Sequence, residues 1–237
     1  MGRETERRAG HAPTGMPSSG PPSPAGASGA TWARRALAGI ILAAVAIQFW
    51  TGTTGTPGFR GDNFFSFFTI QSNLFAAAVL LAGRNDSLRG AATLYLVITG
   101  AVYATLLSGL ERTLQTPLPW VNFVLHRLSP VALVVDWLAE PPRCPLRWRA
   151  ALLWMVYPLL YRGYSLVRGA CVGWYPYPFL DPRHVGGYGR VALVCGLIAL
   201  GALVAAGLVV WSGNWRARRR GTGAAPPGGG GISAGCF

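Results

Sequence analysis

The sequence predicts an all-α membrane protein with six transmembrane helices, and three observations carry this prediction. Hydrophobic residues make up 51% of the 237 residues and charged residues only 12%, against about 25% charged in an average soluble domain. Six apolar segments, each near the length that crosses hydrocarbon as a helix, follow one another along the chain. The 21 basic residues are all arginines that lie mostly between these segments, so the net charge of +13 indicates membrane topology rather than nucleic-acid binding.

The two ends of the chain differ in composition from its middle. Residues 1–33 are rich in Pro, Gly, Ser and Ala and predict a disordered N-terminal tail, and residues 213–237 predict a disordered basic C-terminal tail. Between them, residues 34–212 form the predicted six-helix transmembrane domain. Its apolar segments are 34–52, 64–83, 90–109, 121–139, 150–168 and 189–212.

The flanks of the segments support these boundaries. Arg34 and Arg35 precede the first segment, as in a secretory signal, but no small-residue cleavage site follows Phe49, which favours a retained span. Tryptophans near the segment ends are typical of interfacial anchors. They are Trp50, Trp120, Trp174, Trp211 and Trp215.

Arginine counts predict the orientation of the spans. A cytoplasmic N-terminus places fourteen arginines on the inner side and four in the outer loops. The four outer ones are Arg60, Arg112, Arg168 and Arg183. This asymmetry follows the positive-inside rule, and an even number of spans returns the C-terminus to the cytoplasm. Because arginine without lysine indicates GC-biased coding, we expect a multi-pass protein of a bacterial cytoplasmic membrane.

Two of the predicted spans carry polar residues at helical spacing. In the second span these are Asp62, Ser66, Thr69 and Asn73. In the fourth span they are Asn122, His126, Ser129 and Asp136. Each set lies close to one face of a helix, and polar side chains are costly in lipid, so we expect both faces to point into the bundle or into a cavity.

Thr69 and His126 lie at matching depth in these two spans, which run in the same direction. Each is five residues beyond the outer end of its segment, a depth of about 7–8 Å. A hydroxyl becomes a useful nucleophile when a nearby base accepts its proton, and imidazole suits that task near neutral pH. The two residues therefore suggest a nucleophile and its base. The alternative is a threonine bonded to a backbone carbonyl and a satisfied interior histidine.

Other polar residues suggest supporting or substrate-binding roles. Asn73 and Asn122 are candidates to orient the histidine or to donate to an oxyanion. Asp136 either bonds within its polar face or pairs with an arginine near the inner interface. Arg162 either binds a carboxylate or phosphate headgroup or extends to the interface. The outer loop of residues 173–182, rich in proline and aromatic residues, is either an interfacial cap or a lid.

The sequence gives no reason to expect a metal or another cofactor. Of the three histidines only His126 lies at membrane depth, whereas a haem held by two histidines needs a second one. The four cysteines show no C-x-x-C spacing, which argues against a zinc site. We expect the partners to be membrane lipids or a lipid-like substrate and not nucleic acid.

Several of these residues occur in an order found in a known family. The elements are Phe68-Thr69, Asn122-x-x-x-His126 with Asp136 ten residues on, Tyr157, and the run Tyr177-Pro178-Phe179-Leu180-Asp181. Over about residues 34–212 the chain resembles the androgen-induced transmembrane hydrolases. The resemblance implies a multi-pass hydrolase that cleaves fatty acid esters of hydroxy fatty acids with an intramembrane threonine and a histidine, here Thr69 and His126.

The resemblance also adds supporting residues and shows two departures. Tyr177 of the loop motif joins the candidate supporting residues, to which the polar face of the second span already contributes Ser66. Phe123 stands where the animal proteins have a second histidine, and Arg127 follows the histidine where a small polar residue is expected.

Two other function classes are compatible with the polar faces. A transporter for lipids or small molecules would line its pathway with them, although no internal repeat relates the first three spans to the last three. A structural membrane protein would use them only to hold helices together, and it would tolerate Thr69→Val with a modest loss of stability.

Overall fold

The computed structural model describes residues 25–83, 85–110 and 118–222, and these residues form helices and connecting loops with no strand. The longer helices are α1 (Ala25–Gly55), α3 (Phe68–Ala82), α4 (Asp86–Val102), α6 (Ser129–Ala139), α7 (Trp148–Val172) and α9 (Tyr188–Thr222). The shorter ones are α2 (Gly61–Phe64), α5 (Pro119–Phe123), α8 (Pro182–Val185) and the 3-10 helix η3 (Pro178–Leu180). Two π-helical turns are η1 (Tyr103–Leu107) and η2 (Val124–Leu128). The all-α prediction is confirmed for these residues.

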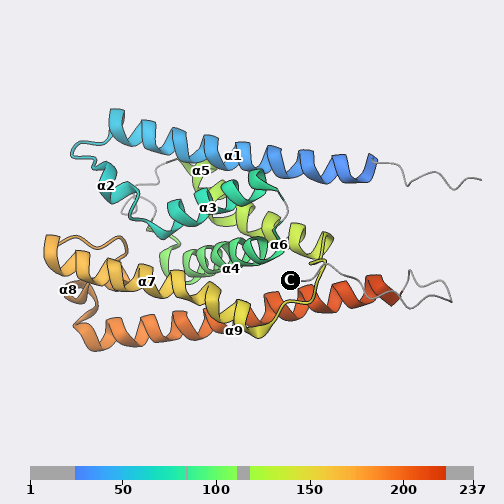
Figure 1. Cartoon of the computed structure of the whole chain (residues 1–237). Coiled ribbons are helices and arrows are strands. Elements are labelled where there is room, and N and C mark those ends of the chain that lie inside the picture. Colours follow the sequence, from blue (N-terminus) through green and yellow to red (C-terminus); the bar gives the residue numbers. More distant parts are fainter. Residues whose placement is uncertain (1–24, 84, 111–117, 223–237) are drawn as a thin grey trace, which may run out of the picture.

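The long helices lie side by side, with α4 in the middle of the bundle (Figure 1). Helix α4 contacts α3, α6, α7 and α9, while α1 packs on α3 and α7 packs on α9. Burial agrees with this arrangement, because 61% of the apolar stretch that includes α4 is buried, compared with 28% for α9. We call the end of the bundle that carries α2 and α8 the loop end. The opposite end, where α1 begins and α9 finishes, is the termini end (Figure 1).

Four helical stretches are long and apolar enough to cross a membrane, so the chain is a membrane-type helical protein. They are Gly29–Gly55, Asp86–Leu107, Pro119–Ala139 and Tyr188–Arg220. The two other predicted spans are also helical, but α3 has only 15 residues and α7 carries Arg149, Arg162 and Arg168. Large apolar side chains lie on the outside of the bundle, where Leu153 is 70% and Leu193 is 63% exposed. Such a surface suits contact with lipid.

The predicted start of the second span at residue 64 is wrong. The chain forms the short helix α2, breaks at residues 65–67, and enters α3 only at Phe68. Aromatic packing holds α2 apart from α3, since the ring of Phe64 lies 5.3 Å from that of Phe49 in α1 and 5.2 Å from that of Phe65. The break places the first turn of α3, including the buried Thr69, inside the bundle.

The tails predicted to be disordered are partly helical. Helix α1 begins at Ala25 and α9 continues to Thr222, beyond both predicted boundaries. The early start of α1 runs through residues 25–31, where three alanines alternate with two glycines, a serine and a threonine, so local helix propensity does not explain it. The end of α9 is held by Arg216, whose guanidinium donates to the carbonyl of Leu138 near the C-terminal end of α6, 3.0 Å away. The rest of both tails lies outside the described residues.

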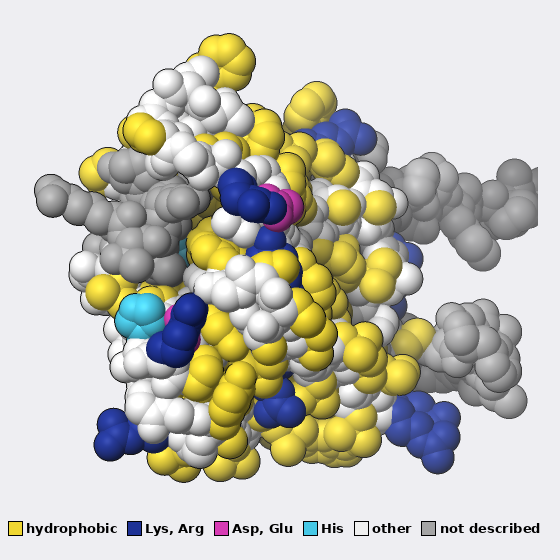
Figure 2. Space-filling view, turned by 90° about the vertical axis from the view of Figure 1, so that its left-hand side faces the viewer, with side chains coloured by type: hydrophobic (Ala, Val, Ile, Leu, Met, Phe, Trp, Pro, Cys, Tyr) yellow, Lys and Arg dark blue, Asp and Glu magenta, His cyan; other side chains and the backbone are white. Residues whose placement is uncertain are grey.

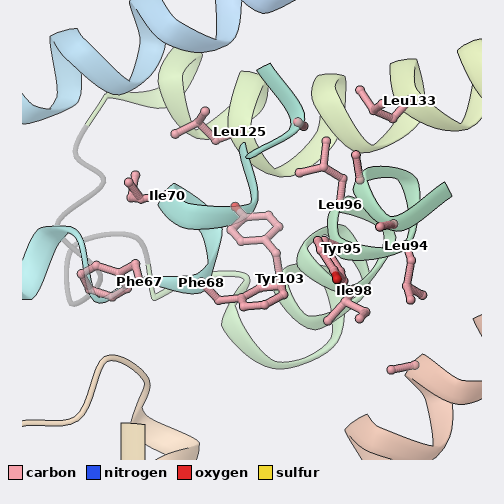
Figure 3. Close-up of a cluster of buried hydrophobic side chains, with 14 of the residues drawn as sticks. Phe67, Phe68, Ile70, Leu94, Tyr95, Leu96, Ile98, Tyr103, Leu125 and Leu133 are labelled. Atoms are coloured by element: carbon pink, nitrogen blue, oxygen red, sulfur yellow. The ribbon is translucent and has the colours of Figure 1, made fainter. Parts of the chain in front are cut away.

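The two π-helical turns meet where α4 approaches the helix of residues 119–139. Pro130 has no N–H to bond the carbonyl of His126, so the regular α-helical ladder cannot continue through this turn. Gly100 of α4 allows the approach, because a Cβ there would lie 3.2 Å from Pro130 and 3.3 Å from the His126 carbonyl oxygen. Figure 3 shows Tyr103 of η1 in the same buried cluster as Phe68.

Candidate active site

Thr69 and His126 meet in the interior of the bundle. The Thr69 Oγ1 lies 3.2 Å from the His126 Nε2, within hydrogen-bond distance. Both side chains are buried. Thr69 is in the first turn of α3 and His126 is in η2, so two elements far apart in the sequence supply a hydroxyl and an imidazole to one place.

The other ring nitrogen of His126 fixes its protonation pattern. The Nδ1 lies 3.2 Å from the backbone carbonyl oxygen of Asn122, one turn earlier. A carbonyl oxygen only accepts, so Nδ1 carries the ring proton and the Nε2 of the neutral ring keeps a lone pair for the Thr69 hydroxyl. The ring of Tyr103 stacks on that of His126 with centroids 4.3 Å apart, and this stacking restricts the orientation of the imidazole. The geometry is that of a nucleophile and a base that is itself oriented by a third group.

The two candidate asparagines have different surroundings. The Asn122 side chain donates to the Tyr103 hydroxyl at 2.7 Å and so holds the ring that stacks on His126. Its Oδ1 is buried and has no hydrogen-bond partner among the described residues. Asn122 therefore acts on His126 through its backbone carbonyl and through Tyr103.

The Asn73 side-chain amide forms hydrogen bonds that hold helices together. Its Nδ2 donates to the carbonyls of Thr69 at 2.9 Å and Leu125 at 3.1 Å, and its Oδ1 accepts from the Ser129 hydroxyl at 2.7 Å. These bonds tie α3 to η2 and α6. With both amide positions engaged, Asn73 fixes the backbone of Thr69 and is not free to donate to an oxyanion as expected.

Two tyrosine hydroxyls cap the beginning of α3. The Phe68 N–H donates to the hydroxyl of Tyr161 at 3.2 Å, and the Thr69 N–H donates to the hydroxyl of Tyr177 at 3.3 Å. The first N–H groups of a helix have no partner within the helix, so these hydroxyls satisfy them. The Tyr177 hydroxyl also lies 3.5 Å from the Thr69 Oγ1.

Two further tyrosines belong to the site, of which the sequence indicated only Tyr161, on a helical face expected to line a cavity or to pack. Tyr103 gave no signal, because its position opposite His126 depends on how two helices are rotated toward each other. Tyr161 shares a helical face with Tyr157 and Tyr164, and that aromatic face was the available clue. The Tyr161 hydroxyl donates to the Ser66 carbonyl at 2.8 Å, so this face packs on the break before α3.

Thr69 and Tyr177 line a pocket between α3, α4, α7 and α9. Its volume is about 90 Å³, and most of its other lining side chains are apolar. Phe179 and Leu180 also line it, and the Phe179 ring stacks on that of Tyr177 with centroids 5.3 Å apart. The loop of residues 173–182 thus contributes Tyr177, Phe179 and Leu180 to the wall of the pocket.

Three other candidate residues lie in different places. Ser66 lies in the break before α3, where its Oγ donates to the Asp62 carbonyl. It therefore does not share a helical face with Thr69, and that prediction is wrong. Asp136 forms ion pairs with Arg34 and Arg89 at the termini end. Pairing with an arginine was the second of the two roles expected for it. Arg162 lines the pocket and makes no hydrogen bond or ion pair with the described residues.

Charged pairs hold the loop end in place. Arg183 bonds Asp181 at 2.7 Å and the Gly173 carbonyl at 2.9 Å, and this bonding holds the pKa of the Asp181 carboxyl well below its usual range. The bond from Arg60 lowers the pKa of Asp62 to about 2. Figure 2 looks onto this end and shows few charged side chains among hydrophobic and uncharged ones. The bonds of Arg183 to Asp181 and Gly173 connect the two ends of the loop that carries Tyr177.

Comparison with known proteins adds no relative. No protein-family model, curated protein or solved structure matches the chain. Within residues 25–83, 85–110 and 118–222, no group of three or more His, Cys, Asp or Glu side chains could hold a metal ion. Conclusions about function therefore depend on the geometry of the site.

Proposed function

We propose that the chain is a membrane hydrolase of lipid esters in which Thr69 is the nucleophile and His126 the base, as its resemblance to the androgen-induced transmembrane hydrolases implies. The observation that carries the proposal is the 3.2 Å contact between the Thr69 Oγ1 and the His126 Nε2 at the wall of an apolar pocket. The carbonyl of Asn122 on the opposite ring nitrogen supports it, because it leaves Nε2 free to accept a proton.

The reaction proceeds through an acyl-threonine. The Thr69 Oγ1 attacks the ester carbonyl carbon while its proton passes to the His126 Nε2, and the Asn122 carbonyl stabilises the imidazolium through Nδ1–H. Collapse of the tetrahedral intermediate breaks the bond to the alcohol oxygen, which takes the proton from His126. A water molecule then attacks the acyl-threonine, with His126 taking the water proton and returning it to the Thr69 oxygen as the fatty acid leaves.

Negative charge on the carbonyl oxygen needs a donor close to the threonine. The Tyr177 hydroxyl lies 3.5 Å from the Thr69 Oγ1 and belongs to the pocket wall. It also sits at the N-terminal end of α3, where the helix dipole favours negative charge. Tyr177 is therefore the donor to the oxyanion in this mechanism.

Arg162 and the apolar walls agree with an acidic lipid as substrate. Arg162 is an exposed residue that also lines the pocket, and the described residues supply no carboxylate to it, so its guanidinium is available to a carboxylate or phosphate. The carboxylate of a fatty acid ester of a hydroxy fatty acid would supply that partner, while its hydrocarbon would contact the apolar lining.

The proposed topology has six spans with both termini in the cytoplasm. It adds α3 and α7 to the four stretches that are long and apolar enough on their own. Two observations support it: α1 begins and α9 finishes at the same end of the bundle (Figure 1), and Arg219 and Arg220 lie in the last turn of α9 at that end. The loop end, which carries Tyr177 of the site, then faces the outside of a bacterial membrane.

Labelling with a fluorophosphonate tests the proposal directly. Purified wild-type protein in detergent is expected to take up the probe and to hydrolyse a long-chain ester, and both activities are expected to vanish in Thr69→Ala and His126→Ala. Thr99→Ala is the matched control, because Thr99 lines the same pocket but its hydroxyl donates to the Tyr95 carbonyl at 3.0 Å and lies 2.9 Å from the Ser72 hydroxyl.

Two results would contradict the proposal. Equal labelling of wild type and both site variants would remove Thr69 as the nucleophile. A folded wild-type protein that neither labels nor hydrolyses esters would leave transport or a structural role as the function.

A further inference from the structure

A second cavity lies beside the pocket, on the outside of the bundle between α4 and α9. Its volume is about 330 Å³, and its walls include Ala101 and Thr105 from α4 and η1 and Leu197, Gly201 and Ala205 from α9. Leu197 is 61% exposed, and Ala101 and Gly201 are also exposed, so the cavity is a groove that opens outward. Both helical stretches that form it are long and apolar enough to cross a membrane, so the groove faces lipid.

The groove and the pocket share part of their walls. Ile98 and Val102 of α4 and Ile198 and Ala202 of α9 line both. The groove therefore lies against the wall of the pocket that contains Thr69, between α4 and α9. Small side chains leave space in the groove, and a Cβ added to Gly201 would meet no atom within 4 Å.

The chemistry of the groove selects hydrocarbon. Its lining carries no charged residue, and its one polar side chain, Thr105, already donates to the Ala101 carbonyl at 2.8 Å. A headgroup or a peptide would leave its polar groups without partners there. On α9 the groove extends from Val194 to Ala205, about 16 Å of helix, which is far longer than a short acyl group needs.

We propose that this groove holds the acyl chain of the substrate, with the ester at Thr69 and the chain passing out between α4 and α9 into the hydrocarbon of the bilayer. The inference rests on the proposed function for the position of the ester. The wall that the groove shares with the pocket that contains Thr69 argues for the substrate chain over a second copy of the protein or a lipid bound elsewhere.

Filling the groove tests the proposal. Gly201→Leu places a side chain in the open space, and Gly196→Leu is the matched control on the same helix, because Gly196 lines neither cavity and its Cβ would also meet no atom within 4 Å. Gly201→Leu is expected to lower kcat/KM for p-nitrophenyl palmitate by about tenfold or more and to leave p-nitrophenyl acetate within about twofold. Gly196→Leu is expected to change neither. Equal loss on both esters, or no loss on palmitate, would overturn the proposal.

Crosslinking separates this inference from the proposed function, since it needs no turnover. A palmitic acid that carries a diazirine in its chain is irradiated with the protein in lipid nanodiscs, and the modified peptides are mapped by mass spectrometry. Crosslinks are expected within residues 97–106 and 194–205, reduced in Gly201→Leu and kept in Gly196→Leu. Ala101→Leu, on the opposite wall, gives the same test if Gly201→Leu does not fold.

The outcomes are distinct. Crosslinks in the groove that respond to Gly201→Leu support the acyl site even if no ester is hydrolysed, in which case the proposed function alone fails. Crosslinks that lie elsewhere or are unchanged by both groove variants overturn the acyl site, even if Thr69-dependent hydrolysis is found.

Discussion

Two buried polar clusters in this bundle differ in how completely their groups are paired. At the termini end, Arg89 is only 2% exposed and its guanidinium bonds Asp136 at 2.9 Å and Asp86 at 3.2 Å. Arg34 bonds the same Asp136 at 2.6 Å and Glu140 at 2.9 Å. In this cluster every arginine has a carboxylate, and the carboxylates bridge α1, α4 and α6.

The cluster around Thr69 is built from neutral groups and stays open on one side. Hydroxyls and an imidazole bond one another, and the Thr69 and Tyr177 hydroxyls also line an apolar pocket. The one charged side chain on that pocket, Arg162, has no carboxylate from the described residues. A closed network in a low-dielectric interior stabilises the fold, whereas polar groups that reach a cavity are available to a ligand. The comparison indicates that the cluster at the termini end stabilises the fold and that the cluster around Thr69 is available to bind a ligand.

The largest expected effect is the loss of ester hydrolysis when Thr69, in the open cluster, is replaced. Thr69→Ala is expected to lower ester hydrolysis at least about 10³-fold, because the nucleophile is lost. The free energy of unfolding should change by only about 1 kcal/mol, since a single hydrogen-bonded hydroxyl is removed. Turnover and thermal unfolding measured in the same detergent check both values. A large loss of stability with turnover retained would make Thr69 structural.

The reverse pattern is expected at the closed cluster. Asp136→Ala leaves both Arg34 and Arg89 short of their shared carboxylate, so unfolding should become easier by about 3–5 kcal/mol while the folded fraction still reacts with a fluorophosphonate. Asp62→Ala is the control, because the Asp62 side chain is 50% exposed and solvent screens its ion pairs, so its loss should change stability much less. Unchanged stability with lost labelling in Asp136→Ala would place Asp136 in the site.

A smaller effect on rate is expected from the proposed oxyanion donor. Tyr177→Phe is expected to lower kcat by about 10²-fold with little change in KM, because the hydroxyl acts when charge develops on the carbonyl oxygen. Tyr164→Phe is the control, since its hydroxyl lies 3.0 Å from the Ser66 Oγ and does not line the pocket. Steady-state kinetics of both variants decide the assignment. An equal effect of the two would indicate a general weakening of the aromatic packing at the loop end.

Part of this arrangement was predictable from periodicity and depth. Apolar runs of span length gave the helices, and the matching depth of Thr69 and His126 placed them together. The break at residues 65–67 was not predictable, because it arises from aromatic packing between α1 and α2 and not from a local breaker. Which side chains surround Thr69 and His126 also depends on how each helix is rotated about its own axis. Tyr161 and Tyr177 reach the start of α3 from 93 and 108 residues away, so the aromatic face and the loop motif marked these residues but not their bonds to the first N–H groups of α3.

The smallest expected effect concerns Arg162, which has no carboxylate partner among the described residues, unlike Arg34 and Arg89 of the closed cluster. Arg162→Gln is expected to lower kcat/KM about tenfold for a lipid ester with a free carboxylate and to leave the matching methyl ester within about twofold. Arg190→Gln is the control, because Arg190 is an exposed arginine of α9 that does not line the pocket. Comparing the two substrates cancels any general effect on folding. Equal loss on both esters would make Arg162 a packing residue, and the open cluster would then recognise its substrate through hydrocarbon and the ester alone.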